Sequence, residues 1–401
     1  MLLTYNECMQ DLQLEKHIES LQLAIKIWAK QHDLWNDSVF KSWMEHWDDE
    51  PPENPCILMI CSDGELASLL KSQWNNDLYE EFGELLKQFS CYHQLWDYGQ
   101  IEILIDNNDK LEEAYRNYFE WQWICSLVEP DFSDLYEEIY AWFHKYPDDL
   151  YDLHPRKFEV LLDGVFRNNG FQTQLGSGQS DGGVDIRLYS NNVIGEVVTL
   201  VQAKRYAASK PINLQAVQAL SAVVEDERAN QGLFVTTSRY LPCAKKFAER
   251  QNRRIELATS DDVSLWCSHA TKRIIRDKSQ LIDPTHLQLL LSRQGSSNTL
   301  EGKVFHAHWG ATMILNSFAI VLRESKGAVL LMELPTIEVS GDSFRGYETP
   351  DLGIAALRHL DVKHIFRAKK KYKDNGELYL WGNRELYSLW DSSPQLYDRL
   401  D

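Results

Sequence analysis

Apolar and polar positions change their spacing several times along this chain of 401 residues. In the first third, apolar residues recur every three or four positions, as they do on one face of an α-helix. The clearest stripe consists of Leu14, Ile18, Leu21, Ile25 and Trp28. A short apolar run, CILMICS at 56–62, is typical of a single buried strand. We therefore expect residues 1–135 to form a mainly helical domain.

The pattern of residues 136–270 alternates between helical and strand spacing. The segment HPRKFEVLLDGVFRNNG has Pro155 at the start of a helical stripe and Gly170 after its end, which are favoured positions for these two residues. Strand patterns follow at 171–175, 184–189, 196–204, 232–238 and 255–258. One helical pattern lies between the third and fourth of these strand segments, and another lies between the fourth and fifth. The order α-β-β-β-α-β-α-β predicts an α/β domain built on a mixed sheet.

The last third of the chain reads as a separate, smaller domain. The stretch SRQGSSNTLEG at 292–302 is rich in Ser, Gly and Asn, so we expect residues 271–300 to be a linker. The run IFRAKKKYKDNGELYLWG predicts a hairpin that turns at Asp374, Asn375 and Gly376. Residues 301–401 are therefore expected to form an α/β or β domain with a basic hairpin.

Charge separates the first third from the rest of the chain. The net charge is −19, and residues 1–150 hold 31 acidic residues against 9 basic ones. The same segment holds nine of the thirteen tryptophans. Three roles are open for it: a solvated surface around an aromatic core, an interaction or autoinhibition module, or a module that stacks modified bases on rings such as Trp121 and Trp123.

Several classes of protein are disfavoured by the composition. The seven cysteines are scattered and none forms a C-x-x-C pair, so a disulfide framework is not expected. The sequence contains no run of about 18 apolar residues, so a membrane span is not expected. The N-terminal residues lack the basic and apolar regions of a signal peptide. We expect a cytoplasmic protein without a membrane partner.

Polar residues interrupt the strand pattern where an interior strand should stay apolar. Gln202 and Lys204 are two positions apart, so they project from the same face of one strand. Asp185 opens the preceding strand, and a hairpin pairing of the two strands would bring it close to both. Glu159 lies at the edge of the apolar stripe of the preceding helix. Carboxylate, amide and main-chain carbonyl oxygens suit a divalent cation, here from Asp185, Gln202 and Ala203. Such a set fits phosphodiester hydrolysis, with Lys204 orienting or deprotonating water.

Over residues 136–267 the chain resembles the Mrr-like restriction endonucleases of the PD-(D/E)xK nuclease superfamily. The motifs are HPRKFEVLLDGVFRNNGFQTQ, SDGGVDIRL, VQAKRY, GLFVTTSRYLPCAKKFA and IELATSDDVSLW, in the order of the family. The resemblance implies catalytic roles for Asp185, Gln202, Lys204 and Glu159, and a supporting or turn-forming role for Asp181. Many superfamily members have Glu or Asp where Gln202 stands, whereas Gln is frequent in the Mrr-like branch.

The resemblance implies a Mg²⁺-dependent endonuclease, with Mn²⁺ as a substitute, that cuts double-stranded DNA of foreign or modified origin in phage defence. One site per chain favours a homodimer or a larger assembly. The basic residues expected to bind nucleic acid are Lys245, Lys246, Arg367, Lys369, Lys370 and Lys371. Two alternatives stay open: a catalytically silent nuclease fold that binds or senses DNA, and an RNase or junction-resolving nuclease of the same superfamily.

Overall fold

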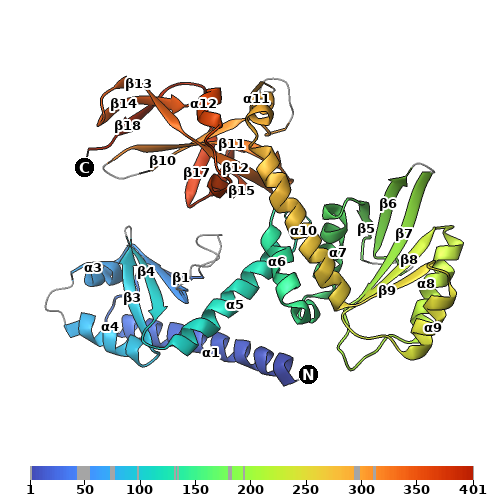
Figure 1. Ribbon diagram of the computed structural model, residues 1–401. Helices are drawn as coiled ribbons and strands as arrows, with labels where there is room; N and C mark the ends of the chain where they lie inside the picture. The colour runs from blue at the N-terminus through green and yellow to red at the C-terminus, as the bar shows by residue number, and fades with distance from the viewer. Residues whose placement is uncertain are drawn as a thin grey trace. The chain divides into compact units, whose positions relative to one another are not determined.

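The computed structural model describes residues 2–42, 55–72, 77–96, 99–130, 132, 135–178, 183–192, 195–292, 299–309 and 313–400. The chain divides into two compact units, residues 1–125 and 126–401, which are treated separately below (Figure 1). Among the helices that the structure describes, none combines the length and the apolar character that a membrane crossing requires. Cys56, Cys91, Cys243 and Cys267 are not part of disulfide bonds.

Unit 1 is mainly helical, but its helices pack on an antiparallel sheet of which the sequence predicted only one strand. Its antiparallel sheet has the strand order β1-β2-β4-β3. The strand predicted at 56–62 is confirmed as β2, but three further strands are present. β1 and β4 pair with β2 across segments that are distant in sequence, which local apolar spacing does not report, whereas β3 pairs with β4 in a hairpin. The elements are α1 (Leu2–Gln31), β1 (Ser38–Lys41), β2 (Leu58–Ser62), α3 (Glu65–Lys71), α4 (Asp77–Lys87), β3 (Cys91–Trp96), β4 (Gln100–Ile105) and α5 (Asp109–Leu127), whose last two residues lie past the boundary.

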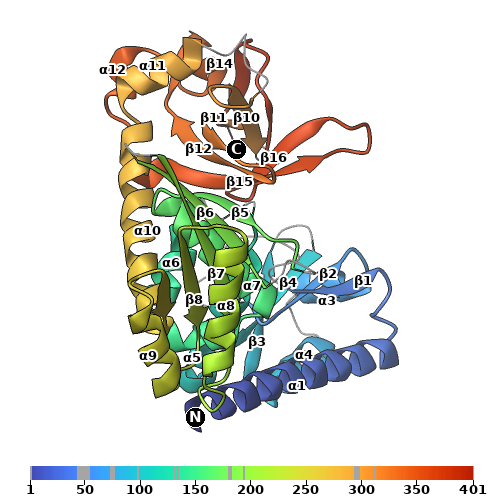
Figure 2. The ribbon, with the colours of Figure 1, turned by 90° about the vertical axis from the view of Figure 1, so that its right-hand side faces the viewer.

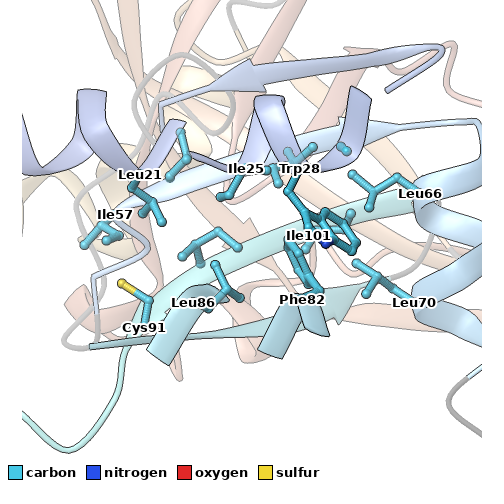
Figure 3. Packing of buried hydrophobic residues seen from close by; sticks show 14 of the residues in the cluster. Leu21, Ile25, Trp28, Ile57, Leu66, Leu70, Phe82, Leu86, Cys91 and Ile101 are labelled. Carbon is cyan, nitrogen blue, oxygen red and sulfur yellow. The ribbon is translucent and has the colours of Figure 1, made fainter. Parts of the chain in front are cut away.

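The core of unit 1 lies between the helices and one face of this sheet (Figure 3). The predicted stripe on α1 is confirmed, because Leu21 and Ile25 are completely buried in it. Trp28 packs on Phe82 of α4 with ring centroids 5.0 Å apart, and its indole N–H donates to Glu81 at 2.9 Å. The aromatic residues of α1 and α4 therefore serve this core, as the first of the three proposed roles requires.

The central part of unit 2 has the predicted order of elements around a five-stranded sheet, β5-β6-β7-β8-β9. The first three strands are antiparallel neighbours and the last three are parallel, so the sheet is mixed. Helices α8 and α9 cover one face, and α7 packs on the other with α10 against it (Figures 1 and 2). The elements are α6 (Glu137–Lys145), η2 (Pro147–Tyr151), α7 (Pro155–Asn168), β5 (Gln172–Leu175), β6 (Ile186–Asn192), β7 (Gly195–Lys204), α8 (Leu214–Asp226), β8 (Gln231–Thr236), α9 (Pro242–Arg250) and β9 (Ile255–Ala258).

The segment expected as a linker, residues 271–300, is largely helical, which corrects that prediction. Helix α10 (Ser260–Leu281) continues well into it, and α11 (Pro284–Ser292) follows. Ile274, Leu287 and Leu290 are buried, so both helices pack apolar residues against neighbouring elements. Residues 293–298, the most Ser- and Gly-rich part of the stretch, lie outside the described residues.

The C-terminal part of unit 2 is a β domain, one of the two forms predicted. Six strands close into a barrel, β10-β11-β12-β15-β16-β17, and three others form the sheet β13-β14-β18. The predicted hairpin is confirmed as β15 and β16, where the N–H of Lys373 donates to Glu377 O at 2.9 Å. The elements are β10 (Val304–Trp309), β11 (Leu315–Glu324), β12 (Ala328–Leu334), β13 (Thr336–Gly341), β14 (Arg345–Pro350), α12 (Ile354–Leu357), η3 (Val362–His364), β15 (Ile365–Tyr372), β16 (Leu378–Gly382), β17 (Glu385–Leu389) and β18 (Gln395–Asp398).

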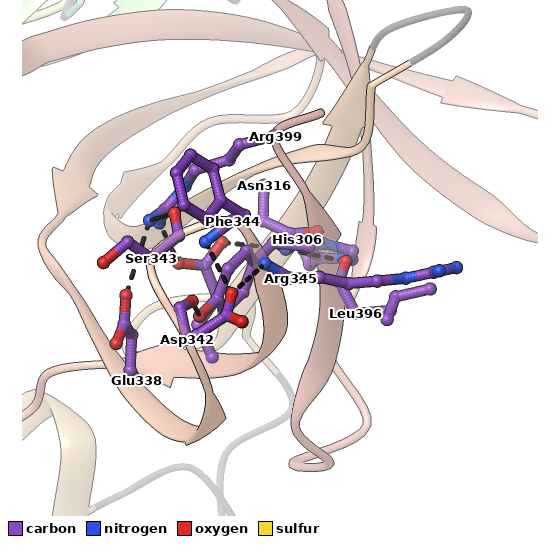
Figure 4. A network of polar contacts seen from close by, with 11 residues as sticks. His306, Asn316, Glu338, Asp342, Ser343, Phe344, Arg345, Leu396 and Arg399 are labelled. Carbon is purple, nitrogen blue, oxygen red and sulfur yellow. Dashed lines mark hydrogen bonds and ion pairs between the residues drawn. The ribbon is translucent and has the colours of Figure 1, made fainter. Parts of the chain in front are cut away.

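A polar network connects the barrel with the three-stranded sheet (Figure 4). His306 Nε2 lies 2.8 Å from Asn316 Oδ1, and the Asn316 amide donates to Glu348 Oε1 at 2.9 Å. Arg399 donates to the other oxygen of Glu348 at 3.3 Å. Burial lowers the pKa of His306, so this imidazole is neutral at pH 7. The network holds the two sheets in one packed domain.

Candidate active site

The antiparallel pairing of β6 and β7 places Asp185 at the carboxyl end of β7. Ile186 pairs with Val201, and the N–H of Asp185 donates to the carbonyl of Val201 at 2.8 Å. One carboxylate oxygen of Asp185, Oδ2, accepts the main-chain N–H of Ala203 at 2.7 Å. Asp185 is only 6% exposed. Main-chain hydrogen bonds on both sides therefore hold this buried carboxylate in one orientation.

Lys204 faces the same carboxylate. Its Nζ lies 3.8 Å from Asp185 Oδ2, at the long end of an ion pair, and a third of its side chain is exposed. The carbonyl of Lys204 accepts the hydroxyl of Thr236 at 2.7 Å, so the neighbouring strand β8 fixes the end of β7. The ammonium group thus has a defined position beside Asp185 and remains accessible to a ligand from solvent.

Gln202 lies beside Gly183, two residues before Asp185. A Cβ atom placed on Gly183 would come within 2.9 Å of Gln202 Nε2. Gly183 also has φ +85, a conformation that side-chain-bearing residues rarely adopt. Glycine at this position is therefore explained by the close approach of Gln202 as well as by the turn. The structure brings Lys204 to Asp185 and places Gln202 beside Gly183.

The main-chain carbonyl of Ala203 is directed to the same region. Within a strand, the N–H and C=O of one residue point to the same side, and the N–H of Ala203 points to Asp185. Strand β6 begins only at Ile186, so this carbonyl extends past the last paired residue of its neighbour. It is thus positioned as an oxygen donor beside the Asp185 carboxylate.

The donor set fits a cation that keeps part of its water shell. The described residues contain no group of three His, Cys, Asp or Glu side chains that would hold a metal ion by themselves. Asp185, Gln202 and Ala203 instead offer one carboxylate, one amide and one carbonyl oxygen. Mg²⁺ accepts few protein ligands of this kind and completes its shell with water and phosphate oxygens. The residues present are therefore compatible with Mg²⁺ and do not form a zinc-type cage.

Glu159 pairs with Arg156 on its own helix. Its carboxylate, on α7, accepts a hydrogen bond from Arg156 Nη1 at 2.7 Å, and its side chain is 14% exposed. In the part of the chain that the structure describes, its ion-pair partner is Arg156 and not Lys204. Asp181 lies outside the described residues, so its predicted supporting role stays a prediction.

Sequence reasoning passed over two arginines at this site. Arg156 stands three residues before Glu159 on a helix, a spacing at which opposite charges meet, and this was the available signal. Arg205 follows Lys204 directly; its Nη1 donates to the carbonyl of Tyr151 at 2.6 Å and its guanidinium lies over the Tyr151 ring. No local pattern indicates the contact between Arg205 and Tyr151, because it joins the end of β7 to η2.

The basic residues expected to bind nucleic acid differ in their surroundings. Lys245 and Lys246 are exposed on α9. Arg367 is instead bonded to Glu138 at 2.5 and 3.0 Å and stacks on Tyr136, and Lys370 is bonded to Glu324 at 2.5 Å. Lys369 and Lys371 lie over the rings of Phe132 and Trp381. The structure does not favour Arg367 and Lys370 as phosphate contacts, because both cations already have carboxylate partners within the chain.

One segment of this chain is similar to known proteins. A family model described as "Restriction endonuclease" matches residues 150–267. The uncharacterized protein y4cE of Sinorhizobium fredii is 31% identical over 105 residues, which are 26% of this chain and 27% of y4cE. The type IV methyl-directed restriction enzyme EcoKMrr of Escherichia coli is 29% identical over 107 residues, 25% of this chain and 34% of that enzyme. The chain therefore spans about a third or less of the length of these curated relatives.

Among solved structures, the MspJI restriction endonuclease in complex with a 27-mer oligonucleotide is similar, with 24% identity and a TM-score of 0.26. The match covers 34% of this chain and 31% of that one, and a TM-score this low carries no argument for the arrangement of domains. The family match rests on the segment itself, which contains Asp185, Gln202 and Lys204 in the paired strands β6 and β7. Residues 150–267 are therefore a restriction endonuclease domain of the Mrr-like type.

Proposed function

We propose that this chain is a metal-dependent DNA endonuclease that acts on foreign or modified DNA. The observation that carries the proposal is the position of the buried Asp185 carboxylate, which is bonded to Ala203 N–H at 2.7 Å and lies 3.8 Å from the Lys204 ammonium. The family match of the surrounding segment supports phosphodiester hydrolysis as the reaction. The methyl-directed relative EcoKMrr supports modified DNA as the substrate.

Each group has a distinct role in this proposal. Asp185, Gln202 and the carbonyl of Ala203 would hold Mg²⁺, or Mn²⁺ in its place. A divalent cation supplies Lewis acidity and offsets the negative charge that develops on the phosphate. Lys204 orients the attacking water and donates hydrogen bonds to the phosphate oxygen on which that charge develops. The buried position of Asp185 strengthens these electrostatic interactions, because water screens them less there.

The DNA backbone would contact exposed cations near the site. Lys245 and Lys246 are exposed on α9, which follows β8, the strand beside β7. One site per chain and two strands per duplex lead us to propose a homodimer or a larger assembly. Sedimentation of the full chain with and without duplex DNA tests this part separately. The acidic unit 1 is proposed to bind a partner or to restrain the nuclease until DNA is present, a role that rests on its charge alone.

Plasmid cleavage in the presence of Mg²⁺ tests the function. Methylated and unmethylated plasmid are incubated with the full chain, with Lys204→Ala, and with Lys272→Ala as a control that removes an exposed lysine of α10. The wild type and the control cut at similar rates, whereas Lys204→Ala is slower by about 100-fold or more. Equal cutting by Lys204→Ala removes the site assignment. No cutting by the wild type on either plasmid favours a silent nuclease fold that binds or senses DNA.

A further inference from the structure

The segment that leads into Asp185 is attached to α7 by the side chain of Arg156. This arginine donates from Nη1 to Glu159 Oε2 at 2.7 Å and from Nη2 to the carbonyl of Gly176 at 2.7 Å. Its guanidinium also lies against Gly178, where a Cβ would come within 3.3 Å of Nη1. One planar cation therefore contacts the helix on one side and the segment 176–178 on the other.

That segment is connected to Asp185 through the main chain. The N–H of Gly176 donates to the carbonyl of Asp185 at 2.8 Å, while the N–H of Asp185 donates to Val201 at 2.8 Å. Gly178 has φ +77, a conformation that favours glycine and leaves its Cα open to the guanidinium. A displacement of Gly176 would therefore move the backbone of Asp185, and with it the carboxylate that faces Lys204.

We infer that Arg156 is a positioning residue that uses Glu159 as its anchor to hold the backbone of Asp185 in place for metal binding. In this arrangement Glu159 acts through Arg156 and does not itself ligate the cation. A planar guanidinium is suited to this task because it makes two hydrogen bonds in fixed directions, which a lysine cannot do. The inference rests on the proposed function only where it concerns metal binding; the backbone contacts stand without it.

Lys157 provides a matched control on the neighbouring position of the same helix. It also bonds one carboxylate, Glu129 at 2.8 Å, and one main-chain carbonyl, that of Val128 at 3.2 Å. These contacts lead away from the segment before Asp185. Arg156→Ala and Lys157→Ala therefore remove the same kinds of interaction from α7, and only the first removes contacts with Glu159 and Gly176.

The test begins with hydrogen exchange of the full-length, metal-free protein, followed by mass spectrometry. In Arg156→Ala, exchange at peptides that contain Gly176 and Asp185 is expected to be roughly tenfold faster, the effect of one lost charge-assisted hydrogen bond. Arg156→Lys gives a smaller increase, and Lys157→Ala leaves these peptides as in the wild type. Unchanged exchange in Arg156→Ala overturns the inference, as does an equal increase in Lys157→Ala.

A second readout distinguishes positioning from general stability. For Arg156→Ala, the Mg²⁺ concentration that gives half-maximal cleavage and the Kd for Mn²⁺ from calorimetry are both expected to rise about tenfold. Cleavage at saturating Mg²⁺ recovers much of the loss. A loss that is equal at all Mg²⁺ concentrations contradicts the positioning role.

The two proposals fail in different ways. If the wild type cuts no DNA but Arg156→Ala still accelerates exchange, the proposed function falls and the inference about Arg156 stands. If the wild type cuts DNA and exchange in Arg156→Ala is unchanged, the proposed function stands and the inference falls.

Discussion

The carboxylate of Asp185 accepts the main-chain N–H of Ala203 at 2.7 Å, and this one bond connects two strands at the point where Gln202 and Lys204 emerge. It orients the buried carboxylate before any ligand arrives. Preorganised groups of this kind lower the barrier of a reaction because they do not have to rearrange in the transition state. The bond also decides how Asp185 can be replaced without disturbing the fold.

Asp185→Asn should keep the fold and lose the activity. The amide oxygen of Asn can accept the N–H of Ala203, but the charge that attracts a divalent cation is gone. We expect Mn²⁺ binding by calorimetry to fall below detection and DNA cleavage to decrease by about 100-fold or more. The melting temperature stays close to that of the wild type. Asp226→Asn, which alters an exposed carboxylate of α8, serves as the control; a normal cleavage rate in Asp185→Asn would contradict the assignment.

Gln202→Glu should tighten metal binding. A second carboxylate next to Asp185 adds charge to the donor set, and we expect the Kd for Mn²⁺ to fall about tenfold. Without metal, the two carboxylates repel each other, so the same variant should unfold at a lower temperature. Gln172→Glu, on the exposed side of β5, makes the same chemical change away from the site. Identical Mn²⁺ affinity in Gln202→Glu and the wild type would remove Gln202 from the proposed ligands.

Lys245→Ala combined with Lys246→Ala should weaken DNA binding in a salt-dependent way. Each lysine that contacts a phosphate contributes about one unit to the slope of log K against log salt concentration. We expect the slope to decrease by about two, measured by fluorescence anisotropy with a labelled duplex. Lys370→Ala is the control, because its ammonium is bonded to Glu324 at 2.5 Å. A change of slope in the control alone would reverse the assignment of the DNA-contacting residues.

Arg367→Ala should destabilise the contact between the barrel and α6. Arg367 is bonded to Glu138 and lies 3.5 Å from Glu137, which also pairs with Lys278 of α10. Removal of the arginine leaves Glu138 without its main partner, at a cost of roughly 2 kcal/mol for a partly exposed carboxylate. Urea unfolding measures the loss. Lys363→Ala removes an exposed ion pair and should leave the free energy of unfolding almost unchanged. An equal loss of unfolding free energy in both variants would mean that the cluster around Arg367 does not stabilise the fold.

Acid should destabilise unit 1 through His93. Burial lowers the pKa of His93, which packs between the rings of Tyr79 and Phe82. The unfolded chain binds the proton at a higher pH than the folded chain does. The contribution of neutral His93 is therefore complete above about pH 6.5 and is lost as the pH falls through the lower folded value. His93→Phe keeps an aromatic ring but does not titrate, so its melting temperature should decrease less between pH 7.5 and 5.5. A parallel decrease in both proteins would exclude His93 as the cause.

Much of the nuclease domain follows from local sequence. Asp185, Gln202 and Lys204 could be placed together from the sequence because β6 and β7 are consecutive strands, and side chains on a strand alternate with a period of two. The α7 stripe and the β15–β16 hairpin follow from equally short-range patterns. In unit 1 the same reasoning missed β3 and β4. Strand β4 pairs with β2 across about 40 positions, and β3 joins the sheet through a hairpin with β4.

The sequence by itself determined the order of elements in residues 150–267, the family to which that segment belongs, and the placement of Asp185 beside Lys204 at the end of β7. Only the tertiary structure decided that Glu159 is paired with Arg156, that Arg367 is enclosed by the carboxylates of α6, and that helices fill most of the expected linker. The physical reason is the distance along the chain over which each feature is determined. Strand alternation and helix periodicity are set by neighbouring residues, whereas the partner of a charged side chain depends on which distant elements pack beside it.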